Sequence, residues 1–285
     1  MKKKNIIIYT VISYAWSYTF WLIAIVLAYR SNIELELNEG FVEALYSSEL
    51  IGKVAILSII ALVATWGPMI GTLVITKIDP DFKEKFSSSA FVYRGFKQYL
   101  IVIAIFLAIG FAPAIPLIFI EGFKSNSVSI IILYLFTFFT IQFVTSGTEE
   151  IGWRGFLLPE LLKKYDTWAA SFRTGIIWAL WHAPVVLYIF YLQDMPLFAM
   201  VFSFFGFSVG IIAMSAVHSY FFIKTRSVLF SVYLHAMSNT IPLITGLLIL
   251  NAYKTAILSQ LLIWVVVAVI IKKNPRMFPK KEKNS

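Results

Sequence analysis

The chain has 285 residues, a mean hydropathy of +0.81, and 59% hydrophobic against only 14% charged residues. Soluble domains carry about 25% charged and 45–50% apolar residues, so this composition excludes a soluble globular protein and a disordered one. The net charge of +9 is not gathered in a soluble basic domain, so nucleic-acid binding is not expected. Cysteine is absent, which excludes disulfides, thiolate metal sites and a cysteine nucleophile.

Eight apolar segments are each long enough to span a bilayer, which takes about 20 residues of helix. They cover roughly residues 5–29, 53–76, 97–120, 128–148, 173–192, 197–223, 228–250 and 255–271. We therefore expect an all-α, polytopic transmembrane helical bundle of about eight spans, forming a single membrane domain over residues 1–285. The first segment is too long for the apolar core of a signal peptide and lacks a cleavage site, so we expect it to be retained. Prolines inside spans, at Pro68, Pro113 and Pro116, are expected to kink or break their helices.

The distribution of lysine and arginine predicts the topology. If the N-terminus is cytoplasmic, 20 of the 24 basic residues fall on the cytoplasmic side of the eight-span alternation and four on the other. This asymmetry follows the positive-inside rule. Both termini are therefore expected to be cytoplasmic, in a multi-pass protein of the cell membrane.

Ionisable side chains at membrane depth are costly and are candidates for function. Glu149 and Glu150 come near the end of the fourth predicted span, followed by Arg154. Glu150 and Arg154 are four residues apart and can pair on one helix face, while Glu149 is rotated by about 100° and stays free. A free, desolvated glutamate is suited to act as a general base. The alternative is a solvated helix end with a surface salt bridge.

Three further polar residues fall in the cytoplasmic half of the membrane. They are His182 in the fifth predicted span, and His235 and Asn239, which share one face of the seventh. With Glu149 they could activate a water and stabilise an oxyanion. Glu149, His182 and His235 could instead form a His₂Glu zinc site. A core histidine bonded to a carbonyl, or an interhelical polar contact, would also account for them.

The remaining histidine, His218 in the sixth predicted span, is expected to serve packing or the membrane interface rather than catalysis. The chain has no H-E-x-x-H zinc helix, no G-x-S-x-G elbow and no nucleotide-binding glycine loop. Its aspartates fall in predicted loops, which argues against a two-aspartate site.

Three short motifs occur in order between about residues 140 and 250. Glu149, Glu150 and Arg154 match E-E-x-x-x-R, Trp178 and His182 match F-x-x-x-H with tryptophan in place of phenylalanine, and the third, H-x-x-x-N, begins at His235. In these motifs the chain resembles the CAAX prenyl protease 2 family, also called the CPBP or Abi family of intramembrane proteases. Single matches of this kind are weak, but three in order on predicted helices are specific.

The resemblance implies a role for each matching residue. Glu149 would be the base that activates water, His182 would assist it, and His235 with Asn239 would form the oxyanion hole. The family's structural picture favours a glutamate mechanism with no metal cofactor, whereas its older description was that of a metalloprotease.

The resemblance also implies supporting roles. Glu150 and Arg154 would be a pair that fixes the helix, and Trp178 would keep the aromatic position of the second motif.

The implied function is an intramembrane endopeptidase that cleaves a hydrophobic or lipidated peptide near the cytoplasmic leaflet. Bacterial members of the family are linked to bacteriocin self-immunity and peptide processing. A non-catalytic membrane immunity or regulatory protein is the first alternative. A transporter or channel is the second, although no internal repeat supports it.

Overall fold

The computed structural model describes residues 2–33, 35, 53–88, 90, 92–93, 95–123, 128–249 and 252–275. Within this part of the chain the regular structure is helical, apart from one isolated bridge between Phe123 and Ile249. The predicted all-α class is thus confirmed. In chain order the helices are α1 (Lys3–Ser31), α3 (Lys53–Ala64), α4 (Gly67–Ile78), α5 (Pro80–Ser87), α6 (Gly95–Glu121), α7 (Val128–Val144), α8 (Ser146–Gly152), the π-helix η2 (Trp153–Leu157), α9 (Leu158–Leu162), α10 (Thr167–Trp181), α11 (Ala183–Leu192), α12 (Leu197–Thr225), α13 (Val228–Leu248) and α14 (Ala252–Lys273).

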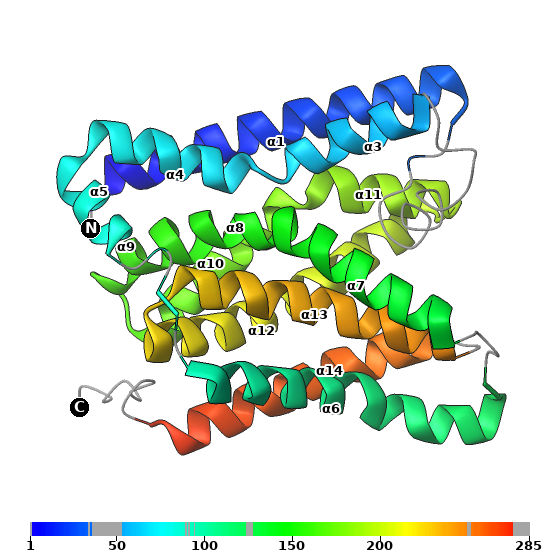
Figure 1. The fold of residues 1–285 in the computed structure, drawn as a ribbon. Coiled ribbons are helices and arrows are strands. Elements are labelled where there is room, and N and C mark those ends of the chain that lie inside the picture. Colours follow the sequence, from blue (N-terminus) through cyan, green and yellow to red (C-terminus); the bar gives the residue numbers. More distant parts are fainter. Residues whose placement is uncertain are drawn as a thin grey trace.

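The long helices lie side by side, as Figure 1 shows. Among the described residues, five helices are long and apolar enough to cross a membrane, and up to seven crossings result if each of two bent pairs is one span. Every predicted apolar segment falls largely on helix, which confirms a polytopic bundle. The total of eight spans and the orientation remain predictions. The last predicted segment lies on α14, a helix of 22 residues that packs beside α6 and α12.

Two predicted spans are bent pairs of helices. α3 and α4 meet at 49°, with Pro68 in the first turn of α4, and α10 and α11 meet at 50°, with Pro184 in the first turn of α11. Proline has no N–H and suits the start of a helix, so each pair breaks just before its proline. Pro113 and Pro116 were expected to kink or break their helix, and α6 is not broken, since it continues through both prolines. Neighbouring helices often re-satisfy the backbone groups that a proline frees within a membrane.

Small residues bring α1 and α4 into close contact. A Cβ added at Gly71 would lie 2.5 Å from Oγ of Ser13, and one at Gly67 would collide with Ser17. Ser17 also donates to the carbonyl of Ala64 at 2.7 Å, at the end of α3. In lipid, helices associate through such close packing and polar contacts rather than through a hydrophobic driving force. The contact fixes α1 and α4 as one layer of the bundle.

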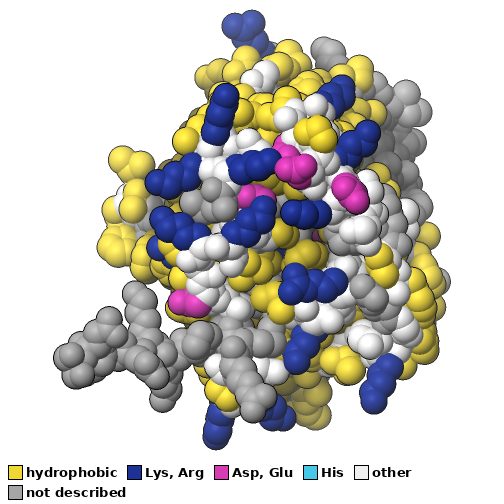
Figure 2. Space-filling model, turned by 90° about the vertical axis from the view of Figure 1, so that its left-hand side faces the viewer, with side chains coloured by type: hydrophobic (Ala, Val, Ile, Leu, Met, Phe, Trp, Pro, Cys, Tyr) yellow, Lys and Arg dark blue, Asp and Glu magenta, His cyan; other side chains and the backbone are white. Residues whose placement is uncertain are grey.

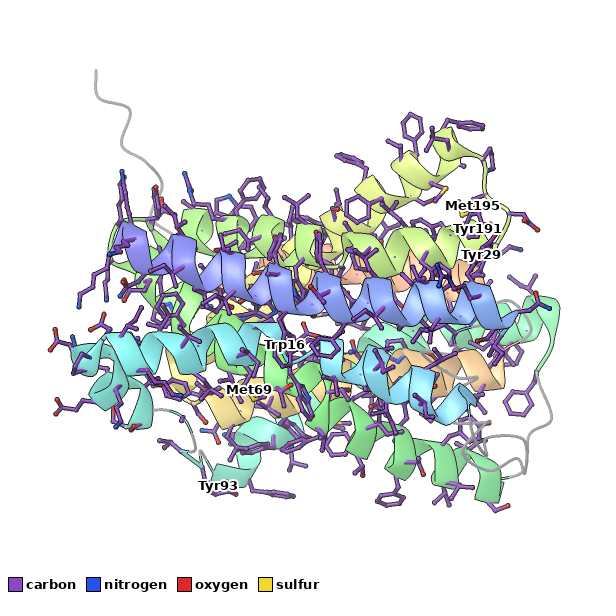
Figure 3. All side chains as sticks on the ribbon, turned by 90° about the horizontal axis from the view of Figure 1, so that it is seen from above. Trp16, Tyr29, Met69, Tyr93, Tyr191 and Met195 are labelled. Carbon is purple, nitrogen blue, oxygen red and sulfur yellow. The ribbon has the colours of Figure 1, made fainter. Side chains whose placement is uncertain are left out.

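Aromatic residues mark the ends and the bend of this layer. Figure 3 shows Trp16 of α1 at the junction of α3 and α4, where its indole N–H donates to the carbonyl of Val63 at 3.0 Å. Tyr29 and Tyr191, both exposed, lie at the end of the molecule away from the N-terminus of α1, whereas exposed Tyr93 lies toward the other end. Such an arrangement is typical of aromatic residues at the two membrane interfaces.

The most enclosed span is α13. Of its most apolar window, 78% is buried, against 11–33% for the other four single-helix spans. It contacts α6, α7, α8 and α12, and lies in the middle of the bundle in Figure 1. Polar side chains on α13 are therefore held among other helices rather than facing lipid, as expected for functional residues at membrane depth.

Candidate active site

The E-E-x-x-x-R motif lies inside a long span, not at its solvated end. The span continues from Ile131 to Leu162, passing through α8, η2 and α9. Glu149, Glu150 and Arg154 are all buried, which overturns the alternative of a solvated helix end. The apolar run of the sequence ends before the motif, but the helix goes on because α4 and α13 cover it. Arg154 lies in the π-helical turn η2, and such turns are often found at functional sites.

Glu150 and Arg154 form the predicted pair. Nη1 of Arg154 donates to Oε1 of Glu150 at 2.9 Å, and both side chains are fully buried. Charges removed from water in this way must be paired, because each has lost its solvation. Arg154 also stacks over the ring of Trp178, with 4.9 Å between Cζ and the ring centroid. Glu150 is therefore committed to a fixed charge pair.

Glu149 faces a different set of partners. Its Oε2 accepts hydrogen bonds from two indole N–H groups, those of Trp178 at 2.9 Å and Trp153 at 3.2 Å. The side chain is only 2% exposed, and no ion pair joins it to a described residue. Of the two adjacent glutamates, Glu149 is thus the one left without a salt bridge, as the helical spacing predicted.

Trp178 lies at the centre of the cluster. Its ring centroid is 5.2 Å from that of His235, 5.7 Å from that of His218 and 6.0 Å from that of His182. The side chain is 2% exposed, and its indole N–H reaches Glu149. Residues from α8, α10, α12 and α13, separated widely in the sequence, therefore meet around one indole.

His182 occupies the break between α10 and α11. Its Nδ1 is 2.9 Å from the carbonyl oxygen of Trp178. A carbonyl can only accept, so Nδ1 carries the hydrogen and Nε2 of the neutral ring keeps a lone pair. A buried histidine without a catalytic role would make the same bond to a carbonyl, so the bond fits that alternative as well. It also leaves Nε2 able to take a proton, on a side chain that is only partly buried.

His235 is oriented by the charge pair. Its Nδ1 lies 2.9 Å from Oε1 of Glu150, the oxygen that also binds Arg154. Because an ionised carboxylate only accepts, Nδ1 donates here and the position of Nε2 is fixed. Glu150 therefore links the first motif to the third.

Asn239 lies one turn beyond His235 on α13. Its Nδ2 donates to Oε1 of Gln142 on α7 at 2.7 Å, so it takes part in the interhelical contact that was the alternative reading. The bond uses one amide hydrogen and leaves the second, with Oδ1, for other partners. Gln142 was not predicted as part of the site, although a polar residue within an apolar span is itself a signal.

His218 is the second residue that the sequence did not assign to the cluster. The side chain is fully buried, with Nδ1 3.4 Å from Oε1 of Glu150 and its ring 5.5 Å from that of His235. A packing role fits this position, but a place at the membrane interface does not. The sequence feature that could have indicated His218 is that it is a histidine, one of three in the chain. All three histidine rings contact Trp178.

The geometry does not fit the zinc alternative. Among the residues that the structure describes, no group of three histidine, aspartate or glutamate side chains could hold a metal ion. Glu149, His182 and His235 each contact Trp178 without forming such a group.

Comparisons with known proteins match the region that holds this cluster. Residues 128–241 match a family model described as Rce1-like, type II CAAX prenyl endopeptidase. A curated relative, "CAAX prenyl protease 2" of Methanococcus maripaludis, is 26% identical over 184 residues. The match covers 64% of this chain and 64% of the relative, so it spans less than two thirds of either protein. Both comparisons support the family assignment that the three motifs indicated.

Proposed function

We propose that this chain, which resembles the CAAX prenyl protease 2 family in its motifs and in both comparisons, is an intramembrane endopeptidase of the glutamate type. The family supports a protease in general terms. The finer assignment rests on one observation. Two adjacent glutamates are buried together, yet only Glu150 carries a salt bridge, while Glu149 is held by two neutral indole donors. A carboxylate held in this way is free to exchange a proton.

In the proposed reaction Glu149 is the general base. A water bonded to its carboxylate loses a proton to Glu149 as the water oxygen attacks the peptide carbonyl carbon. The resulting tetrahedral intermediate collapses when the C–N bond breaks and the proton passes to the departing amine. His182 assists by accepting a hydrogen bond from the same water at Nε2, the nitrogen that its bond to Trp178 leaves free.

The third motif stabilises the negative charge that develops on the carbonyl oxygen. Asn239 supplies an amide hydrogen, with its side chain oriented by Gln142. His235 contributes through Nε2, which the bond of Nδ1 to Oε1 of Glu150 orients, and it donates there when that nitrogen carries a proton. Preorganised donors of this kind are typically worth about 10²–10³ in kcat each.

The substrate class follows from the surroundings. The cluster is buried among membrane-spanning helices, so we propose a peptide whose tail is hydrophobic or lipidated and enters from the bilayer. From the positive-inside distribution of lysine and arginine we propose that both termini are cytoplasmic and that cleavage occurs near the cytoplasmic leaflet of the cell membrane. Processing of a peptide, including self-immunity to a bacteriocin, is the proposed biological setting.

The proposed mechanism uses no metal cofactor. In support, the described residues offer no cluster of three histidine, aspartate or glutamate ligands. If this is right, 1,10-phenanthroline and EDTA leave the activity of the purified protein unchanged. Loss of activity with a chelator and its recovery with added Zn²⁺ would contradict it.

Glu149→Gln tests the function directly. The full chain is reconstituted in liposomes with a fluorogenic peptide bearing a C-terminal farnesylated cysteine motif, and in parallel with the same peptide lacking the lipid. Loss of the base is expected to lower kcat by about 10²–10⁴. Glu84→Gln, at an exposed site on α5, is the control and is expected to match the parent. Equal rates for the parent and Glu149→Gln would overturn the proposal and favour a non-catalytic regulatory or immunity role.

A further inference from the structure

A cavity separate from the glutamate cluster opens at the end of the molecule where α1 begins. Its volume is about 260 Å³. The residues that line it come from the first turn of the chain, from α5 and the residue before it, from η2 and α9, and from the end of α12. Its charged lining consists of Lys2, Lys85, Lys163 and Arg226 and of three carboxylates, Asp79, Asp81 and Glu160.

Two cations of this cavity are neutralised inside the protein. Nζ of Lys2 lies 2.8 Å from both carboxylate oxygens of Asp79, and Lys163 pairs with Glu160. Arg226 differs, since its guanidinium makes no ion pair with any residue that the structure describes. The four cations and three carboxylates of the lining leave one positive charge in excess.

The backbone of Arg226 is held in a conformation that an arginine rarely adopts. It caps α12 with φ of 51° and ψ of 40°, in the left-handed region, and its N–H donates to the carbonyl of Phe222 at 2.7 Å. Glycine is the usual residue at such a helix end because a Cβ is disfavoured there. A strained residue that keeps a long charged side chain is a candidate for function.

The cavity lies at the level where candidate spans end. Lys2 precedes the span that starts at Lys3, Lys163 follows the span that ends at Leu162, and Arg226 follows the span that ends at Thr225. Figure 2 shows Lys and Arg side chains gathered over this face, with acidic side chains among them. The lining also includes the aromatic side chains of Phe82, Phe86 and Phe222, of which Phe82 and Phe222 are buried.

We propose that this cavity binds the phosphate of an anionic lipid headgroup, with Arg226 as its principal ligand. Arginine binds phosphate through paired, charge-assisted hydrogen bonds. Basic pockets between membrane helices on the cytoplasmic side are known sites for anionic headgroups. The volume is below the roughly 300–1,000 Å³ of pockets that take drug-sized molecules, so it suits a headgroup with its acyl chains left outside.

The test measures thermal unfolding of the full chain in detergent as lipid is added. Phosphatidylglycerol is expected to raise the melting temperature of the parent in a saturable way, whereas phosphatidylcholine is not. In a third series, the melting temperature is measured with inorganic phosphate alone, and with inorganic phosphate in competition with phosphatidylglycerol. Arg226→Gly removes the guanidinium and also relieves the backbone strain, so the lipid-free variant is expected to be at least as stable as the parent.

Two variants distinguish lipid binding at Arg226 from a general attraction of anionic lipid to the positively charged surface. Arg226→Gly is expected to need at least about tenfold more phosphatidylglycerol for half of the shift. Lys224→Gln removes an exposed cation two residues away that does not line the cavity, and is expected to match the parent. Competition by inorganic phosphate would support recognition of the phosphate itself. A shift with phosphate but not with phosphatidylglycerol would overturn a lipid as the source. Equal shifts with both lipids, or equal losses in both variants, would overturn the site.

Discussion

The indole N–H of Trp178 donates a hydrogen bond of 2.9 Å to Oε2 of Glu149, and this bond joins the second motif to the first. The F-x-x-x-H pattern has phenylalanine at this position, which offers no such donor. In this chain the aromatic residue thus contributes both packing for three histidine rings and a polar contact to the proposed base.

Trp178→Phe separates these two contributions. The ring is kept and the donor is lost, so we expect kcat to fall by about tenfold or more with KM changed less than about twofold, since hydrogen bonds to charged groups are worth about 1.5–3 kcal/mol. Steady-state kinetics on the reconstituted protein measures this. Trp168→Phe on the same helix, where Trp168 packs against Trp264, is the matched control. Indistinguishable kinetics for both variants would show that the indole N–H does not position Glu149.

Removing one partner of the Glu150–Arg154 pair is expected to destabilise the folded state strongly. Glu150→Gln and Arg154→Met should each destabilise the fold by about 3–5 kcal/mol, because each leaves one buried charge unpaired. The double variant should lose much less than the sum of the two. Reversible unfolding in mixed micelles gives the double-mutant cycle. Lys163→Met is the control, since Lys163 is 44% exposed and its pair should be worth about 1 kcal/mol or less. Additive losses at Glu150 and Arg154 would contradict the pairing.

Gly152 lies where α8 packs tightly against α4 and against Tyr9 of α1. A Cβ at this position would collide with Tyr9 and Pro68, whose carbonyl carbon would be 2.7 Å away. Gly152→Ala should therefore destabilise the protein by about 1–3 kcal/mol, as overpacking does. Gly206 on α12 is the matched control, because a Cβ there meets no atom within 4 Å. Gly206→Ala should be neutral or stabilising by up to about 1 kcal/mol, since glycine is unfavourable within a helix. A stable Gly152→Ala protein would show that α4 and α8 can move apart freely.

A pH effect on stability is expected outside the membrane, at the contact between Lys2 and Asp79. Hydrogen bonds from Lys2, with further help from Phe82 and Asn5, hold the pKa of the Asp79 carboxyl below its usual 3.8. The same contact raises the pKa of Lys2 above its usual 10.5. A lowered carboxyl pKa stabilises the folded state above the unfolded pKa and loses this effect as the pH falls through the folded value. The raised pKa of Lys2 also stabilises the folded state, but at pH values below the unfolded pKa of 10.5. This contribution is lost as the pH rises through the folded pKa.

Asp79→Asn tests this window. The melting temperature of the parent should exceed that of the variant at neutral pH, and the two should converge as the pH falls below about 4. Asp81→Asn is the control, because Asp81 is 82% exposed and lies 3.6 Å from Lys2. A difference between parent and Asp79→Asn that is the same at pH 3 and pH 7 would assign the effect to packing rather than to charge.

The sequence by itself determined the helical class, because spanning segments are set by local apolar length, and every predicted segment lies largely on helix. Spacing within one helix was equally reliable. It predicted that Glu150 pairs with Arg154 and that Glu149 does not, because residues four apart share a face. The ordered motifs also indicated the family that the comparisons support.

Only the tertiary structure decided which side chains meet across helices. The contacts of Trp178 with Glu149 and three histidines, and of Asn239 with Gln142, join helices far apart in the chain, and such distances depend on how helices pack and bend. The same holds for burial. The sequence left open whether Glu149 is solvated, because burial is determined by the neighbours that cover a helix. Here α4 and α13 cover it, and they enclose the proposed base.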